Sequence, residues 1–199
     1  MGRNKICLAR HGEIMAGGGK RFIGQIDLPL SDTGVRQAAR LRDRLAGYEF
    51  DRIFCSDLAR SVATARIISE HHGPEPIAVE GLREINMGLW EGLTFDEVRR
   101  LYPGEYEKRG SDIVDYSGHG GESFARCALR VLAALDEILS AASGDILIVG
   151  HAGVNRIIIS WALGMPMENI FRIAQDYGCL NILAATGMGL RLEILNHTF

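Results

Sequence analysis

Two short apolar runs, each ending at a histidine followed by small residues, constrain the fold of this chain more than any other feature. The first run, residues 6–9, leads into Arg10-His11-Gly12-Glu13, and the second, residues 146–150, leads into His151-Ala152-Gly153. Apolar runs of this length, bounded by glycine, are typical of buried strands. Ligands of open α/β sheets bind at the carboxyl ends of such strands. We therefore expect the two histidines to form two halves of one site.

Strand-like and helical patterns alternate along the chain, which predicts a three-layer α/β/α fold with a mostly parallel sheet covered by helices. Strands are expected over residues 5–10, 52–56, 77–80 and 145–150, with an antiparallel closing pair at 181–186 and 189–196 joined by a tight turn at Gly187-Met188. Helices are expected over residues 31–47, 58–71, 94–101, 122–142 and 154–163. Segments 14–30 and 102–121 have no regular pattern and can cover the strand ends as lids.

Length and composition place this fold in a single domain, residues 1–199, with an ordinary globular composition. The net charge of −3 gives no global basic field, so nucleic acid is not an expected partner, and no apolar run is long enough for a membrane span. The four scattered cysteines, without a Cys-x-x-Cys pair, indicate reduced thiols and a cytoplasmic location. The edge of the closing strand pair leaves a homodimer open.

The residues at the expected strand ends favour phosphoryl transfer. A neutral imidazole such as that of His11 can attack phosphorus without a strong base, and the adjacent Arg10 both keeps it neutral and neutralises phosphate charge. Arg60 lies near the N-terminus of the second helix, where anions are favoured. Glu84 follows the third strand and can protonate a leaving oxygen. Together these residues predict a reaction that passes through a phosphohistidine.

Other phosphate chemistries do not fit the spacing of the residues. Four residues separate Cys55 from Arg60, whereas cysteine phosphatases need five. The Gly17-Gly18-Gly19-Lys20 segment lacks the earlier glycine and the following Ser or Thr of a P-loop. No paired His or Asp cluster has a convincing metal-ligand spacing, so no metal is expected. A Gly-x-Gly-x-x-Gly motif is absent after the first strand, where a dinucleotide site would need it, so no cofactor is expected either.

Four motifs, taken together and in order, resemble the histidine phosphatase superfamily in its phosphoglycerate-mutase-like branch. The similarity extends from residue 6 to about residue 186, and its motifs are Arg10-His11-Gly12-Glu13, the segment 56–60, Glu84 within Leu-Arg-Glu-Ile-Asn-Met-Gly-Leu-Trp-Glu-Gly, and Gly150-His151-Ala152-Gly153. This resemblance implies a three-layer α/β sandwich that hydrolyses or transfers phosphoryl groups without a metal.

The resemblance also implies a role for each site residue. His11 would be the nucleophile, and Glu84 would be the general acid and then the base that activates water. Arg10, Arg60 and His151 would surround the phosphoryl group. Gly24 and Gln25, in segment 14–30, and Ala152, in the second histidine motif, would line the substrate pocket.

Within the superfamily, the short 102–121 segment and the motifs at 86–92 and 120–124 are similar to the α-ribazole phosphatase group of cobalamin biosynthesis and its broad-specificity relatives. This similarity favours a phosphatase acting on a small phosphomonoester. A phosphoglycerate mutase is the alternative, and a binding protein that reads phosphorylated ligands without turnover is a second one.

Several other residues are expected to have structural roles. Lys20 and Arg21 are interpreted as solvated loop charges, with contact to the distal end of the substrate as the alternative. Trp90 and Tyr177 are interpreted as core residues. Glu13 is expected either to cap a turn or to hold an active-site residue, and Glu122 to complement a helix dipole.

Overall fold

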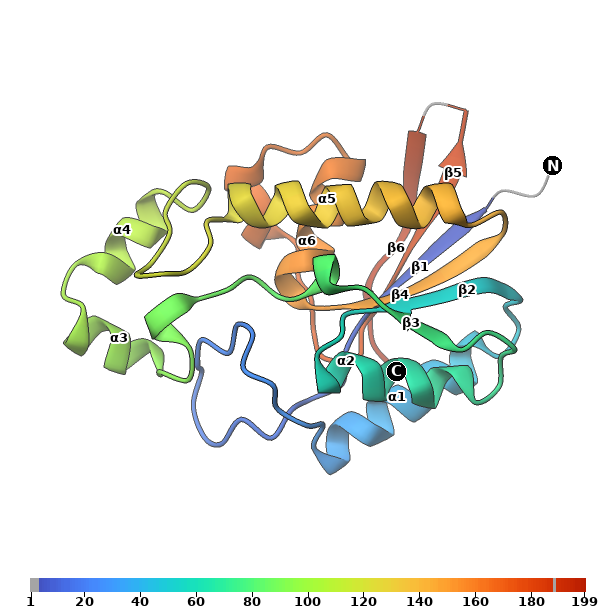
Figure 1. Ribbon diagram of the computed structural model, residues 1–199, viewed down its shortest axis with the longest axis horizontal. Helices are drawn as coiled ribbons and strands as arrows, with labels where there is room; N and C mark the ends of the chain where they lie inside the picture. The colour runs from blue at the N-terminus through green and yellow to red at the C-terminus, as the bar shows by residue number, and fades with distance from the viewer. Residues whose placement is uncertain (1–3, 188) are drawn as a thin grey trace.

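A six-stranded sheet lies at the centre of the protein, and helices cover both of its faces (Figure 1). The computed structural model describes residues 4–187 and 189–199. Across the sheet the strands lie in the order β3 (Pro76–Ala78), β2 (Phe50–Cys55), β4 (Asp145–Gly150), β1 (Lys5–Arg10), β5 (Leu180–Thr186) and β6 (Gly189–His197). All six expected strands are confirmed, with ends that differ from the expected ones by at most two residues.

Two pairs of helices form the outer layers. The α-helices are α1 (Asp32–Leu45), α2 (Ala59–Ser69), α3 (Phe95–Leu101), α4 (Glu105–Ser111), α5 (Phe124–Ala141) and α6 (Ala152–Ala162), and the 3₁₀ helices are η1 (Glu80–Leu82), η2 (Gly88–Trp90) and η3 (Met167–Arg172). Helices α1 and α2 pack together on one face of the sheet, and α5 and α6 pack on the other (Figure 1). The predicted three-layer α/β/α fold is therefore confirmed.

The central strands bury both of their faces, and alternate residues enter different cores. In β1, Ile6 and Leu8 join the core beneath α5 and α6, whereas Cys7 and Ala9 join the core above α1 and α2. Strand β4 alternates in the same way. Because both faces are covered, these strands are continuous apolar runs in the sequence and do not alternate with polar residues.

The pairing is parallel on one side of β1 and antiparallel on the other. Strand β1 pairs in parallel with β4, β4 with β2, and β2 with β3. Strand β5 runs antiparallel to both β1 and β6, so the predicted antiparallel closing pair is confirmed. Met188, half of the predicted Gly187-Met188 turn, lies outside the described residues. Among the described residues β6 forms one edge of the sheet.

Two helices, α5 and α6, begin at other residues than the sequence predicted. Helix α5 begins at Phe124 because Ser123 is its N-cap and accepts a hydrogen bond from the Arg126 amide. Helix α6 begins at Ala152, two residues before the expected start, because His151 is its N-cap. The second histidine therefore stands at a helix N-terminus, where backbone N–H groups lack partners within the helix and favour an anion.

The expectation that residues 102–121 are irregular is wrong for its middle part, which forms α4. Glu105 and Glu107 lie in the first turn of α4, and Lys108 and Arg109 lie in the last, so the charges complement the helix dipole. None of its seven residues is buried, so the sequence carries no apolar periodicity that could reveal the helix.

We predict that Leu147→Ala lowers the free energy of unfolding by about 2–5 kcal/mol, because Leu147 is completely buried in β4 and truncation leaves a cavity. The matched control is Leu129→Ala, at a side chain that is 74% exposed. Urea unfolding of both variants tests the prediction, and the melting temperature should fall by about 5–15 °C for Leu147→Ala alone. Equal losses in both variants would contradict this assignment of the core.

Candidate active site

The register between β1 and β4 brings the two histidine motifs together. Arg10 pairs with Gly150 at the carboxyl ends of these parallel strands, and the His11 amide donates to the Gly150 carbonyl at 3.1 Å. The next residues along the two strands are His11 and His151, whose ring centroids are 5.0 Å apart. The expectation that two distant motifs meet at one sheet edge is confirmed by this geometry.

His11 is held in one tautomer and in its neutral form. Its side chain is buried, and Nδ1 lies 2.7 Å from the Gly12 carbonyl oxygen, so Nδ1 carries the proton and donates it. The second ring nitrogen, Nε2, is left as the lone-pair nitrogen. Burial lowers the pKa of His11 well below its ordinary value, and the charges of Arg10 and Arg60 lower it further. A neutral imidazole is the nucleophilic form.

His151 lies beside His11 and is completely buried. Burial, followed by His11 and the nearby arginines Arg60 and Arg10, lowers the pKa of His151 well below its ordinary value. Both histidines are therefore uncharged near neutral pH, and the positive charge around them belongs to the arginines.

Arg60 fixes the loop that faces the strand ends. Its buried guanidinium donates to the Ile26 carbonyl at 2.6 Å and to the Gly24 carbonyl at 2.8 Å. Gly24 has φ +53°, and a Cβ there would collide with the carboxylate of Glu91. The same carboxylate accepts a hydrogen bond from the Gln25 amide at 2.7 Å. Only glycine fits position 24 without strain, and the loop carbonyls are thereby set in place.

Arg10 is oriented by a backbone carbonyl and by an aromatic ring. It donates to the Gln175 carbonyl at 2.6 Å, and its guanidinium carbon lies 3.8 Å from the centroid of the Tyr177 ring. The interpretation of Tyr177 as a core residue is wrong, because its half-buried side chain lines the cavity next to His11. The interpretation of Trp90 as a core residue is confirmed.

Unpaired buried nitrogens converge at this edge of the sheet. Nε of Arg10, Nε of Arg60 and both ring nitrogens of His151 are buried and have no hydrogen-bond partner within the described part of the chain. Most buried polar groups in proteins are paired. Three basic side chains with unpaired nitrogens make a site that suits an oxyanion with several acceptor oxygens, such as a phosphoryl group.

Glu84 faces the same site from the segment after β3. Its Oε2 accepts a hydrogen bond from the Gly153 amide at 3.1 Å, and its Oε1 accepts one from the Ile85 amide at 3.0 Å. Gly153 lies in the first turn of α6, and a Cβ at this position would collide with the Glu84 carboxylate. The carboxyl group is therefore fixed at the N-terminus of the helix that follows His151.

Arg130 and Glu122 clamp the segment that carries Glu84. The Arg130 guanidinium donates to three carbonyl oxygens of this segment, those of Gly81 (3.0 Å), Arg83 (2.7 Å) and Glu84 (3.1 Å). Glu122 pairs with Arg130 at 2.8 Å and accepts a hydrogen bond from the Asn86 amide at 2.9 Å. Glu122 was expected only to complement a helix dipole, and the sequence gives no sign of this bridging contact.

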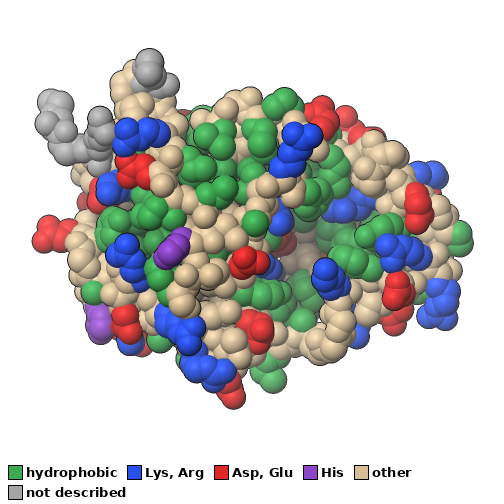
Figure 2. Space-filling view, turned by 180° about the vertical axis from the view of Figure 1, so that it is seen from behind, with side chains coloured by type: hydrophobic (Ala, Val, Ile, Leu, Met, Phe, Trp, Pro, Cys, Tyr) green, Lys and Arg blue, Asp and Glu red, His purple; other side chains and the backbone are tan. Residues whose placement is uncertain are grey.

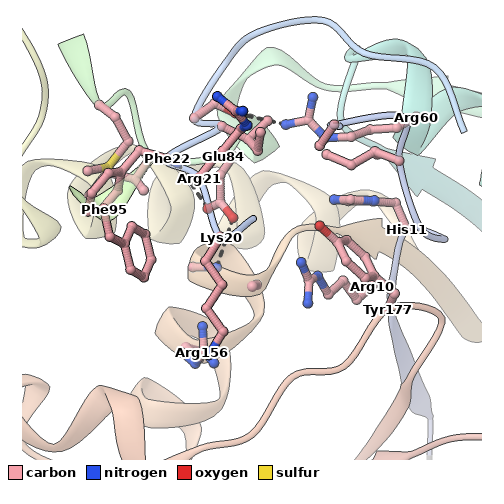
Figure 3. Close-up of a pocket in the computed structure, with 18 of the residues that line it drawn as sticks. Arg10, His11, Lys20, Arg21, Phe22, Arg60, Glu84, Phe95, Arg156 and Tyr177 are labelled. Carbon is pink, nitrogen blue, oxygen red and sulfur yellow. Dashed lines mark hydrogen bonds between the residues drawn. The ribbon is translucent and has the colours of Figure 1, made fainter. Parts of the chain in front are cut away.

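A cavity of about 610 Å³ opens over these groups. Figure 2 shows a hollow on this side of the molecule with Lys, Arg and hydrophobic side chains around it, and Figure 3 shows the labelled residues converging on the pocket. Of the predicted site residues, the cavity lining contains Arg10, His11, Gly24, Arg60, Glu84 and Ala152.

Two predicted site residues stand behind that lining. His151 is completely buried and is absent from the lining, and Gln25 uses its side chain to donate to the Glu84 carbonyl at 3.0 Å. Gln25 therefore supports the segment of Glu84 and does not face the cavity. Glu13 also lies outside the lining, because its carboxylate accepts a hydrogen bond from Ser31, the N-cap of α1.

Several cavity residues were missed from the sequence. Arg109, Arg156, Phe124 and Phe171 line the cavity, and so do Lys20 and Arg21, which were interpreted as solvated loop charges. Arg156 could have been found, because it lies four residues after Ala152 and therefore on the same face of α6. Arg109 lies in segment 102–121, which was expected to cover the strand ends, but nothing in the sequence showed which side chains of that segment would face the cavity.

Across residues 4–187 and 189–199, no group of three or more His, Cys, Asp or Glu side chains could hold a metal ion. None of the helices in the same residues is long and apolar enough to cross a membrane.

The fold and the site together define an α/β enzyme for phosphoryl transfer built around a histidine, and known proteins support this class. The sequence matches the histidine phosphatase superfamily (branch 1) over residues 6–198. The adenosylcobalamin/alpha-ribazole phosphatase of Escherichia coli (strain K12) is 30% identical over 196 residues, covering 96% of this chain and 95% of that protein. A protein of Yersinia pestis (strain Pestoides F) named probable phosphoglycerate mutase GpmB is 34% identical over 166 residues, covering 81% of this chain and 76% of the relative.

Solved structures agree with the sequence relatives. The crystal structure of the alpha-ribazole phosphatase from Shigella flexneri superposes with a TM-score of 0.88 at 28% identity, covering 97% of this chain and 96% of that one. The chain therefore belongs to the histidine phosphatase superfamily and is a phosphatase enzyme. The resemblance found in the sequence is confirmed.

We predict that His11 and His151 stay neutral in the folded protein as the pH falls from 8 to 5, because burial and the arginines lower both pKa values. NMR titration of ¹⁵N-labelled imidazoles tests this, with the urea-unfolded chain as the reference. Unfolding lets these imidazoles bind protons, so the stability that they contribute is complete above the ordinary histidine pKa and is lost as the pH falls below it. Titration of either ring near its ordinary pKa in the folded protein would contradict the prediction.

Proposed function

We propose that this protein hydrolyses small phosphomonoesters through a phosphohistidine at His11. The observation that carries the proposal is the neutral, oriented ring of His11 beside the unpaired nitrogens of Arg10, Arg60 and His151. These groups supply a nucleophile and charge stabilisation for one phosphoryl group.

In the first step, Nε2 of His11 attacks phosphorus. The bond between phosphorus and the leaving oxygen breaks, and the protonated carboxyl group of Glu84 gives its proton to that oxygen, so an alcohol departs. Arg10, Arg60 and His151 donate hydrogen bonds to the phosphoryl oxygens as their charge redistributes. The hydrogen bond from Nδ1 to the Gly12 carbonyl stabilises the positive charge that develops on the His11 ring.

In the second step, water attacks phosphorus and the bond to Nε2 of His11 breaks. The carboxylate of Glu84 takes a proton from the attacking water, which restores its protonated form. The products are inorganic phosphate and the neutral His11 ring. One carboxyl group serves both steps, which is why its fixed place at Gly153 and Ile85 matters.

The position of Glu84 argues against a binding protein without turnover. A site that only bound phosphate would gain nothing from a carboxylate in the lining of a cationic cavity, because like charges repel. A proton donor for the leaving group, in contrast, has to stand there. The mutase alternative uses the same groups and differs only in the acceptor of the phosphoryl group, which the assay below decides.

The names of the relatives suggest α-ribazole 5′-phosphate as a substrate to test first, with 3-phosphoglycerate and sugar phosphates in the same panel. We also propose a cytoplasmic location, supported by four buried cysteines that are all free thiols. A homodimer and the lack of nucleic-acid or membrane partners stay predictions.

We predict that the protein releases inorganic phosphate from phosphomonoesters in the presence of EDTA, and that His11→Ala lowers kcat by about 10³-fold or more, because it removes the nucleophile. Acid-labile, base-stable ³²P-labelled protein should appear in rapid quench of the native enzyme and be absent from His11→Ala. His71→Ala, at an exposed histidine, is the matched control and should keep full activity. Retained turnover in His11→Ala would refute the mechanism.

The same assay separates the mutase alternative. Product analysis with 3-phosphoglycerate and a bisphosphate primer shows whether phosphate appears in water or returns to the glycerate skeleton. Isomerisation faster than release of phosphate would overturn the proposed hydrolase in favour of the mutase.

We predict that Glu84→Gln affects substrates according to their leaving groups. An alkyl phosphate needs a proton on its leaving oxygen, so kcat should fall by about 10²–10⁴-fold, whereas p-nitrophenolate leaves without one. With p-nitrophenyl phosphate the variant should show a burst of one nitrophenolate per site and then slow turnover, because water activation is also impaired. Stopped-flow absorbance measures the burst.

The clamp residue Arg130 gives a second variant for this prediction. Arg130→Ala frees the Glu84 segment and should reproduce the same dependence on the leaving group in a milder form. Arg126→Ala, at an exposed residue of the same helix, is the control. Equal losses with alkyl and aryl phosphates in Glu84→Gln, without a burst, would contradict the role of Glu84 as the acid.

A further inference from the structure

The cavity carries more positive charge than one phosphoryl group requires. Six of the lining residues are Lys or Arg, and Glu84 is the single acidic residue in the lining, which consists of described residues only. Arg10 and Arg60 flank His11 and suffice to neutralise a phosphoryl dianion. Arg21 is paired with Glu97 at 3.8 Å. The remaining cations are Lys20, Arg109 and Arg156.

Arg109 projects from α4 into an aromatic corner of the cavity. Its guanidinium carbon lies 5.6 Å from the ring centroid of Phe22, 5.8 Å from that of Phe124 and 5.6 Å from that of Phe171. These distances are near the outer limit for cation–π attraction. Burial lowers the pKa of Arg109, and no carboxylate among the described residues pairs with it. Its charge is held in a partly desolvated place without an anion.

Arg156 reaches the same corner from α6. Its guanidinium carbon lies 5.3 Å from the Phe171 centroid, so this ring has both arginines near it. One nitrogen of Arg156, Nε, donates to the Ile173 carbonyl at 2.7 Å, which leaves its outer nitrogens toward the cavity that it lines. Figure 3 shows Lys20 and Arg156 extending into the pocket away from His11.

Arg99, which does not line the cavity, is a nearby arginine whose partners can be compared with those of Arg109. Arg99 lies over the Tyr106 ring at 4.0 Å and is also paired with Asp96 at 3.0 Å. Arg109 has rings at a longer distance and no carboxylate. Partly desolvated cations without a partner are costly unless an anion reaches them, so packing alone does not account for Arg109. Arg156 has a carbonyl partner for Nε only and adds a second cation to the same corner.

We infer that this corner is a subsite for a second anionic group on the leaving alcohol, a carboxylate or a second phosphate, joined to an apolar or ring portion that packs against Phe124 and Phe171. The inference rests on the proposed function, because it describes the leaving group of that reaction. The preferred substrates are therefore phosphomonoesters of acidic alcohols. α-Ribazole 5′-phosphate carries no second anionic group and should be a poor substrate by comparison.

Matched aryl phosphates test the subsite. The set consists of 4-(carboxymethyl)phenyl and 4-(2-carboxyethyl)phenyl phosphate, their carboxamides, and 4-(phosphonomethyl)phenyl phosphate. The methylene groups insulate the leaving oxygen, so the compounds differ in distal charge and little in reactivity. A charge-assisted hydrogen bond to arginine should raise kcat/KM for at least one acid over its amide by about tenfold or more. The phosphonate compared with the carboxylates shows which anion fits better.

Variants assign the preference to its residues. Arg109→Gln and Arg156→Gln should each bring the ratio of kcat/KM for acid and amide toward one, and Arg109→Lys should keep part of it. Lys108→Gln is the control, because Lys108 precedes Arg109 in α4 but is exposed and paired with Glu105. Circular dichroism melting shows that each variant is folded, and Arg156→Gln carries the test alone where Arg109→Gln is not.

Three outcomes are possible, and each decides the matter. An acid preference that the two variants remove supports the subsite. Equal kcat/KM for acids and amides in the native enzyme, or a preference that survives in both variants, overturns the subsite while the hydrolysis stands. No phosphate release from any of the aryl phosphates overturns the proposed function itself.

Discussion

The in-register pairing of β1 with β4 is the constraint on which the rest of the site depends. It sets His11 beside His151 at the carboxyl edge of the sheet, with ring centroids 5.0 Å apart, and both strands are buried on both faces. A shift of register by one residue would move every side chain of one strand to the opposite face and would separate the histidines. The geometry of the two histidines is therefore tied to the packing of the core, because the strands that carry them are part of that core.

Arginine organises this protein at two levels. Arg60 binds two backbone carbonyls and Arg130 binds three, so they fix the loop before α1 and the segment of Glu84. The planar guanidinium has five donors, and a lysine could not replace it in such contacts. Arg60 also lines the cavity and has a buried Nε without a partner among the described residues, so the side chain that fixes the loop is also a proposed donor to the phosphoryl group. The chain has a net charge of −3, yet its cavity is strongly cationic.

The sequence predicted the layers, the succession of strands and helices along the chain, and the residues around His11. All three depend on local patterns. Apolar runs define buried strands, and a histidine that directly follows such a strand has to lie at the carboxyl edge of the sheet. Tyr177, Arg109 and Arg156 were not predicted as site residues, because their roles depend on how distant segments pack. Helix α4 has no buried residue and therefore no periodicity. Tyr177 looks like any aromatic residue in the sequence, and only its ring over Arg10 shows its place in the cavity.

The residues that could be predicted and those that could not have different proposed roles in the cavity: the first carry out the chemistry, and the second select the leaving alcohol. The groups proposed for the chemistry stand at strand ends, at the starts of helices and, for Glu84, on the segment after β3 that Arg130 fixes. The groups proposed to select the leaving alcohol come from helices around the cavity and not from the sheet: Arg109 from α4, Phe171 from η3, Phe124 from the start of α5 and Arg156 from α6. Substitutions in those outer segments can change the charge and shape of the cavity without moving His11 or Glu84. A fold built in this way can keep one phosphoryl-transfer reaction while the leaving group that it accepts changes, so substrate identity has to be argued from Arg109, Arg156 and their aromatic neighbours.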